Sequence, residues 1–263
     1  MVTSDLTGVT RTLLPPLACR ARESVRPDAL LRDPQAVELI KNFAEVDCLM
    51  NMSALDQTFT AMRARQFDRY ACAFLQAHPD GLVVDIGCGL DTRFYRLDNG
   101  QMAWLGVDLP EVIRFRRSFL PDADRCQTLP CSMFDLAWIE EVARMDRPPI
   151  FLAEGVFVYF KESQVKPVVT ALASQFPGSE LAFDALSTSS VKIHNRTSVP
   201  QQTGARLGWG IDDPVALETW GLRLLDRWGY FDDREPRVGL ANLMRFIPFL
   251  ANANFVLHYR LVG

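Results

Sequence analysis

The sequence has few of the residues and patterns that mark metal-binding, secreted or membrane proteins. It contains three histidines and six cysteines in 263 residues, and no CxxC pair gives the spacing of a zinc site. No apolar run is long enough to cross a bilayer, and the N-terminal stretch lacks the charged-then-apolar order of a signal peptide. We therefore expect a cytoplasmic protein with reduced cysteines, no metal and no membrane partner.

Clustered positive charge is also scarce. The formal net charge is −4 at pH 7, and the densest basic stretch consists of Arg114, Arg116 and Arg117. These arginines alternate with apolar residues, which predicts a solvated helix face, whereas a nucleic-acid site needs many basic side chains on one surface. We expect no nucleic-acid partner.

Hydrophobic patterning predicts one domain in four parts. Residues 1–78 are expected to form a helical cap, because apolar residues recur at helical spacing between positions 61 and 75. Residues 79–186 alternate short apolar runs with helical patterns and are expected to form the core. Residues 187–211 are polar and too long for a plain connection, which indicates a lid or an insertion, and residues 212–263 complete the core.

Four short apolar runs in the core are typical of strands that are buried on both faces. They lie at residues 82–86, 104–107, 150–153 and 181–183, with helical patterns between them. This alternation predicts an α/β fold with a doubly wound, mostly parallel sheet. The alternating pattern of residues 254–261 predicts a half-exposed, antiparallel C-terminal strand.

A glycine-rich loop follows the first predicted strand. Gly87 and Gly89, in DIGCGLDTR, let the backbone approach a ligand closely. The dinucleotide-binding fingerprint has a third glycine three residues later, where this chain has Thr92, and this difference counts against NAD and FAD.

Two carboxylates follow the ends of other predicted strands. Asp108 is placed to accept hydrogen bonds from both hydroxyls of a ribose, although an N-cap for a helix beginning near Glu111 also explains it. Glu154 stands where open α/β sheets bind ligands, and the alternative is a glutamate that only braces a neighbouring backbone. The glycine loop upstream favours ribose binding for Asp108, and the cost of burying a carboxylate without a partner favours a functional role for Glu154.

These motifs together resemble the leucine carboxyl methyltransferases and the related tetracenomycin-type polyketide O-methyltransferases. The resemblance covers nearly the whole chain and is most specific in GCGLDTRFYRL combined with AEGVFVYF. The final blocks, WGIDDP, WGYFDD and HYRLVG, are more similar to the polyketide-type branch than to the protein-methylating branch. The resemblance implies a Rossmann-like class I methyltransferase fold and S-adenosyl-L-methionine as the cofactor.

The resemblance also implies which residues contact the cofactor. The family's arginine before the first strand falls on Arg63, whose guanidinium is suited to hold the methionine carboxylate, and Arg65 is a neighbouring candidate. The family's glutamate falls on Glu154, which balances the cofactor's ammonium group or holds Arg63. At the adenine site the protein-methylating branch has an aspartate and an apolar residue, and this chain departs from that pattern with Ser132 and Met133.

The sequence gives fewer signals for the residues that contact the methyl acceptor. Tyr159 is a candidate for acceptor contact, and a packed aromatic residue explains it equally well. His194 is a candidate general base, needed only if the acceptor is a phenol, and an exposed loop histidine is the plainer explanation. The cap and residues 187–211 are expected to select the acceptor, and the glycines of the second segment to allow closure.

The sequence thus favours an S-adenosyl-L-methionine-dependent O-methyltransferase that acts on a small-molecule carboxylate or phenol. A protein C-terminal carboxyl methyltransferase is the first alternative, although no electropositive funnel for a chain terminus is evident. A non-catalytic nucleotide-binding relative is the second, and the intact loop with Asp108 and Glu154 argues against it.

The glycine loop gives a prediction about cofactor class. Isothermal titration calorimetry should show binding of S-adenosylhomocysteine and no measurable binding of NAD, because the third glycine that admits a pyrophosphate is missing. Binding of NAD without binding of the adenosyl ligand would contradict this interpretation.

Overall fold

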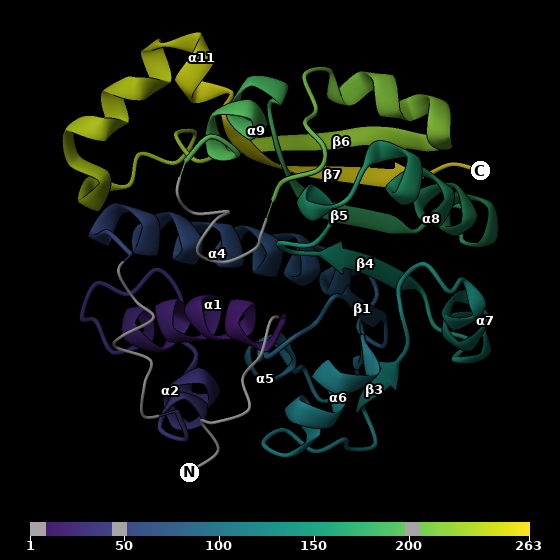
Figure 1. Ribbon diagram of the computed structural model, residues 1–263. Coiled ribbons are helices and arrows are strands. Elements are labelled where there is room, and N and C mark those ends of the chain that lie inside the picture. The colour runs from purple at the N-terminus through teal and green to yellow at the C-terminus, as the bar shows by residue number, and fades with distance from the viewer. Residues whose placement is uncertain (1–8, 44–51, 198–205) are drawn as a thin grey trace.

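The computed structural model describes residues 9–43, 52–197 and 206–263 (Figure 1). Parts of the expected cap and of the expected insertion therefore lie outside the described residues. Within them, a seven-stranded sheet has the order β3-β2-β1-β4-β5-β7-β6. Neighbouring strands run parallel except β7, which is antiparallel to both β5 and β6. The predicted α/β fold with a mostly parallel sheet is confirmed.

The strands have the following bounds: β1 (Leu82–Ile86), β2 (Ala103–Asp108), β3 (Cys126–Pro130), β4 (Pro149–Ala153), β5 (Glu180–Leu186), β6 (Leu222–Gly229) and β7 (Asn254–Leu261). The patterning analysis missed β3 and β6, which are the two edge strands. Each edge strand has exposed positions, so neither forms the continuous apolar run that marks a buried strand.

Helices precede, follow and connect these strands. The α-helices are α1 (Val9–Ser24), α2 (Pro34–Ile40), α4 (Ala54–Ala77), α5 (Arg93–Leu97), α6 (Pro110–Arg117), α7 (Ala137–Arg144), α8 (Glu162–Gln175), α9 (Thr188–His194) and α11 (Pro248–Ala251). Three 3₁₀ segments are η1 (Phe157–Tyr159), η2 (Pro214–Trp220) and η3 (Pro236–Phe246). No helix in the described ranges is long and apolar enough to span a bilayer.

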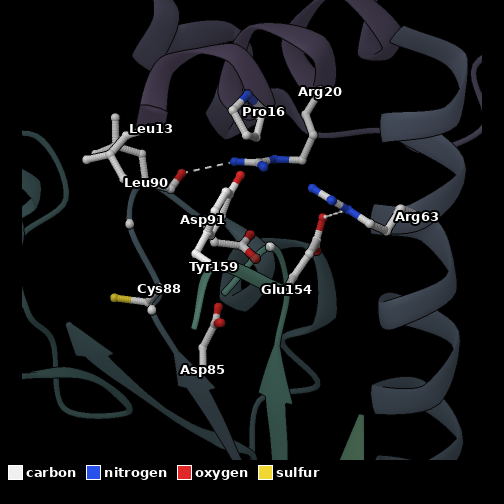
Figure 2. Close-up of a pocket in the computed structure, with 13 residues that line it drawn as sticks. Leu13, Pro16, Arg20, Arg63, Asp85, Cys88, Leu90, Asp91, Glu154 and Tyr159 are labelled. Atoms are coloured by element: carbon white, nitrogen blue, oxygen red, sulfur yellow. Dashed lines mark hydrogen bonds and ion pairs between the residues drawn. The ribbon is translucent and has the colours of Figure 1, made fainter. Parts of the chain in front are cut away.

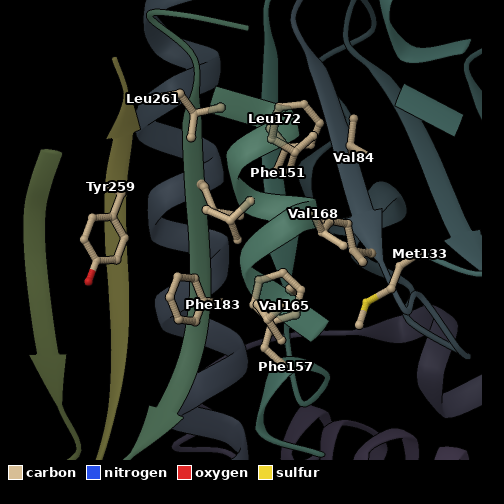
Figure 3. Packing of buried hydrophobic residues seen from close by; sticks show 14 of the residues in the cluster. Val84, Met133, Phe151, Phe157, Val165, Val168, Leu172, Phe183, Tyr259 and Leu261 are labelled. Carbon is tan, nitrogen blue, oxygen red and sulfur yellow. The ribbon is translucent and has the colours of Figure 1, made fainter. Parts of the chain in front are cut away.

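The sheet has a hydrophobic core on each face, because successive strand residues point to opposite sides. Val84 of β1 faces the side on which α7 and α8 pack, and Figure 3 shows it near Val168 of α8. Val83 faces the other side and packs in a cluster with Phe67 and Phe74 of α4. Helices on both faces make the sheet doubly wound, as predicted.

The expectation that residues 254–261 form a half-exposed strand is wrong. β7 is antiparallel as predicted, but it lies between β5 and β6 and is largely buried. The polar side chain of His258 is accommodated inside because its Nε2 lies 2.8 Å from Glu180 Oε2. His258 interrupts the apolar residues of β7 and so contributes to the alternating pattern from which exposure was predicted. It is buried because its polar group has a partner.

The core on the α8 face gives a prediction about stability. Leu172 of α8 is fully buried, so Leu172→Ala should lower the free energy of unfolding by about 2–5 kcal/mol. Leu240→Ala is the matched control, since Leu240 is 86% exposed and its truncation should change stability by less than about 0.5 kcal/mol. Urea denaturation measures both, and equal losses would contradict the burial assigned to Leu172.

Candidate functional site

A pocket of about 150 Å³ opens at the carboxyl ends of β1 and β4 (Figure 2). From β1 the chain builds β2 and β3 on one side of the sheet, and it then returns to place β4 on the other side. Open α/β sheets bind ligands where the strand order reverses in this way. Helix α1 forms one wall and α4 contributes another, and the lining residues are Leu13, Pro16, Arg20, Arg63, Asp85, Gly87, Cys88, Gly89, Leu90, Asp91, Glu154, Gly155 and Tyr159.

Both predicted loop glycines line the pocket, and their conformations require glycine. Gly87 and Gly89 have φ of 69° and 43°, in the left-handed region that side chains rarely adopt. A Cβ on Gly87 would lie 2.4 Å from Val156 Cγ2, and one on Gly89 would lie 2.8 Å from Leu13 Cδ2. The loop therefore packs closely against the segment after β4 and against α1.

Asp108 supports this loop from the end of β2. Its Oδ2 accepts a hydrogen bond of 2.8 Å from the Gly89 N–H, and its Oδ1 accepts one of 2.7 Å from the Leu109 N–H. Burial raises the pKa of the Asp108 carboxyl, and these backbone donors partly offset that effect. The N-cap of α6 is Leu109, so the structure does not place Asp108 in the N-cap position that the sequence allowed.

Arg63 and Glu154 come together in the structure. Arg63 Nε lies 3.1 Å from Glu154 Oε1 (Figure 2). Arg63 Nη1 lies 2.9 Å from Asp184 Oδ2. Burial alone would lower the pKa of the guanidinium, but Asp184 and Glu154 outweigh burial and raise it. Arg63 therefore stays charged beside the pocket.

Arg93 is the main site residue that the sequence analysis missed. It lies in the DTRFYR part of the signature, and its side chain is completely buried. Its guanidinium contacts Asp68 at 2.7 Å, Asp91 at 2.5 Å and Glu154 at 2.6 Å. The only sequence signal was an arginine directly after a glycine loop, which does not reveal burial.

The same network extends to the first helix. Arg96 lies 2.8 Å from Asp68 and 2.7 Å from Asp33, and Asp33 also pairs with Arg20 of α1 at 3.1 Å. Arg20 Nη2 donates a further bond of 3.0 Å to the Leu90 carbonyl in the glycine loop. Ion pairs thus connect α1 and α4 with the ends of β1, β4 and β5.

Asp85 ends this network at the base of the pocket. Its side chain is buried, and Arg93 Nη1 lies 3.6 Å from its Oδ2 as an ion pair. Within the described residues this oxygen accepts no hydrogen bond. Burial raises the pKa of Asp85, Asp91 raises it further, and Arg93 opposes both. A buried oxygen without a hydrogen-bond donor beside a cavity fits a ligand that brings an N–H donor or a positive charge.

Four of the predicted cofactor residues do not line the pocket: Arg65, Ser132, Met133 and Asp108, which lies behind the glycine loop as described above. Arg65 is directed to Asp233, with 2.6 Å between its Nη2 and the carboxylate. The Ser132 hydroxyl accepts from the Phe134 N–H at 3.3 Å. Met133 is buried in the core, where its carbonyl accepts a hydrogen bond of 2.9 Å from Trp138 Nε1. Their contact with a cofactor stays a prediction.

The two candidate catalytic residues lie in different places. Tyr159 belongs to η1, is 43% exposed and lines the pocket. Partial desolvation raises the pKa of Tyr159, while Arg63 lowers it in part. His194 is the last residue of α9, does not line the pocket, and its carbonyl accepts from the Thr197 N–H and hydroxyl.

Arg116 corrects the prediction of a solvated basic face on α6. Arg114 and Arg117 are exposed, but Arg116 is 1% exposed. Its Nη1 donates to the carbonyls of Gly89 at 3.0 Å and Asp91 at 2.6 Å, beneath the glycine loop. Regular helical spacing places every third or fourth residue inward, so the pattern of three arginines concealed one that supports the loop.

Comparison with known proteins defines the class. A family model described as leucine carboxyl methyltransferase matches residues 15–173, which include the C-terminal part of α1, all of α4, the glycine loop and Glu154. The chain belongs to the leucine carboxyl methyltransferase family, as the sequence motifs predicted.

Individual relatives agree with this assignment. The chain is 32% identical over 268 residues, covering 98% of both proteins, to the tetracenomycin polyketide synthesis O-methyltransferase TcmP of Streptomyces glaucescens. It is 28% identical over 246 residues to the S-adenosyl-L-methionine-dependent methyltransferase dpfgK of Gibberella zeae, covering 84% of this chain and 82% of the relative.

Solved structures share the fold. A DUF574-family protein from Streptomyces avermitilis superposes with a TM-score of 0.59 at 13% identity, over 92% of this chain and 96% of that protein. A Thermobifida fusca protein assigned as a methyltransferase superposes with a TM-score of 0.57 at 17% identity, over 99% and 100%.

The arginine network gives a prediction about stability. Arg93→Met keeps most of the side-chain volume but leaves Asp68, Asp91 and Glu154 without their shared cation, so unfolding should become easier by about 3–5 kcal/mol. Arg114→Met on the exposed face of α6 is the control and should change stability by less than about 0.5 kcal/mol. Chemical denaturation compares the two, and a small effect at Arg93 would show that the network is not coupled to folding.

Proposed function

We propose that this chain is an S-adenosyl-L-methionine-dependent O-methyltransferase whose acceptor is a small-molecule carboxylate or phenol. The observation that carries the proposal is a pocket at the switch between β1 and β4 that is built from a glycine loop, a buried carboxylate oxygen that accepts no hydrogen bond from the described residues, and an Arg–Glu pair. Similarity to TcmP over 98% of the chain supports O-methylation and the polyketide-type branch.

The residues present fit the parts of this cofactor. Asp108 at the end of β2 is assigned to the ribose hydroxyls, as carboxylates at this position act in related α/β folds. Asp85 and Glu154 are assigned to the ammonium group, because both line the pocket and Asp85 Oδ2 accepts no hydrogen bond from the described residues. Arg63 keeps 19% exposure of its side chain and is assigned to the carboxylate.

The cofactor supplies a methyl group on a positively charged sulfur, so the protein mainly has to align the acceptor and exclude water. Leu13 and Pro16 of α1 cover the glycine loop and make this part of the pocket apolar. Tyr159 lines the pocket near Arg63 and is assigned to contact with the acceptor. A carboxylate acceptor is ionised at neutral pH and needs no base, so the position of His194 outside the pocket lining does not count against the reaction.

The cofactor assignment gives a prediction for one residue. Asp108→Ala should weaken binding of S-adenosylhomocysteine by about 1.5–3 kcal/mol, the range for hydrogen bonds to a charged group. Asp108→Asn keeps one side-chain oxygen and should lose less. Asp124→Ala, in an exposed turn, is the control and should bind normally. Calorimetry measures all three, and normal binding by the Asp108→Ala variant would remove this residue from the site.

The acceptor class is tested separately. Aromatic acids, aliphatic acids and phenols are incubated with the chain and cofactor carrying a labelled methyl group, beside a peptide with a C-terminal leucine. Transfer to a small acid or phenol supports the proposal. Transfer to the peptide alone would support the protein-methylating alternative, and cofactor binding without any transfer would support a non-catalytic relative.

A further inference from the structure

The last residues of the expected insertion, 207–211, are attached to the turn that carries Tyr159. The Gly208 N–H donates a hydrogen bond of 2.8 Å to the Val158 carbonyl in η1. Three residues later, the Ile211 N–H donates a hydrogen bond of 2.7 Å to the Leu186 carbonyl at the end of β5. Residues 207–211 therefore lie between η1 and the junction of β5 with α9, and they are bonded to both.

Two glycines in this segment make contacts that leave no room for a side chain. A Cβ on Gly208 would lie 2.6 Å from the carbonyl carbon and oxygen of Phe160 and 2.9 Å from the Tyr159 oxygen. A Cβ on Gly210 would lie 2.5 Å from Thr188 Cα. All of these neighbours are backbone atoms, which yield less readily than side chains. Gly208 and Gly210, two of the glycines expected to allow closure, pack the segment against both neighbours, and Gly204 lies outside the described residues.

Further contacts hold the same segment in place. The Asn195 side chain donates a hydrogen bond of 2.8 Å to the Leu207 carbonyl and accepts one of 3.0 Å from the Leu207 N–H. Leu207 is buried in a small cluster with Val158 and Val191. Trp209 stacks on Trp220, with ring centroids 5.5 Å apart and 18° between the planes. The segment is thus fixed at each of its first three residues.

We propose that Gly208 is a positioning residue that sets where Tyr159 stands in the pocket. Tyr159 belongs to a three-residue turn, and its own carbonyl and that of Phe160 rest against Gly208. A side chain at position 208 has to displace these carbonyls, and the displacement moves the ring of Tyr159. The inference rests on the proposed function, because it assigns Tyr159 to the acceptor side of the pocket.

The test compares two alanine variants of similar steric cost. Gly208→Ala pushes on η1, whereas Gly210→Ala pushes on Thr188, away from Tyr159. Both should lower the melting temperature and keep S-adenosylhomocysteine affinity within about threefold of the parent. Only Gly208→Ala should lower kcat/KM for the acceptor found in the screen, by tenfold or more. Equal losses in both variants would show that the effect is general destabilisation.

A double-mutant cycle then shows whether Gly208 acts through Tyr159. In the Tyr159→Ala background, Gly208→Ala should cause less than a twofold further loss of kcat/KM, because the side chain that it displaces is absent. A further tenfold loss, as in the parent, would overturn the proposal.

Hydrogen–deuterium exchange provides a readout that needs no acceptor. Amides of residues 156–161 should exchange faster in Gly208→Ala than in the parent or in Gly210→Ala, and unchanged exchange would overturn the proposed contact. The proposed function fails if the parent binds no S-adenosylhomocysteine, and that result is independent of the exchange data.

Discussion

The site depends on the ion pairs of one fully buried guanidinium, that of Arg93. A charge removed from water is stable only if opposite charges and hydrogen bonds surround it, and Asp68, Asp91 and Glu154 provide them. These carboxylates come from α4, the glycine loop and the end of β4, so the arginine fixes three separate segments at once. Removing any one segment would leave charges buried without compensation.

This constraint extends outward through shared partners. Glu154 joins Arg93 to Arg63, and Asp68 joins Arg93 to Arg96. Each carboxylate that bridges two arginines transmits the position of one guanidinium to the next. The result is a network of ion pairs beneath the pocket that holds the pocket side chains in place before a ligand binds. This preorganisation lowers the entropy cost of ordering those side chains on binding.

The sequence predicted the parts of the fold that follow a simple pattern. Central strands such as β1 and β4 are continuous apolar runs, and they were found where expected. The edge strands β3 and β6 were missed because exposed polar residues interrupt them, and β7 was misjudged because His258 is buried with a partner. In each case tertiary contacts, not local pattern, decide the environment of the polar residues.

The site shows the same division. Gly87 and Gly89 were predicted from their place after the first strand, and the pairing of Arg63 with Glu154 followed from family resemblance. Arg93 was missed, and Arg116 was wrongly placed on the surface. Nothing in the sequence marks these two arginines as buried, because their partners other than Asp91 lie far away in the chain or are backbone carbonyls.

The strand order has a consequence for the biosynthesis of this chain. Among the described strands, β6 pairs with β7 alone, and β7 enters the sheet between β5 and β6 although it comes last in sequence. While the ribosome is still synthesising residues 254–261, one edge of β5 is unpaired and β6 has no neighbouring strand to pair with. The cap and the central strands can assemble earlier, but the sheet closes only after translation has passed β7. Until then the open edge of β5 and the apolar side chains of β6 have no pairing strand, and unpaired strand edges of this kind favour aggregation.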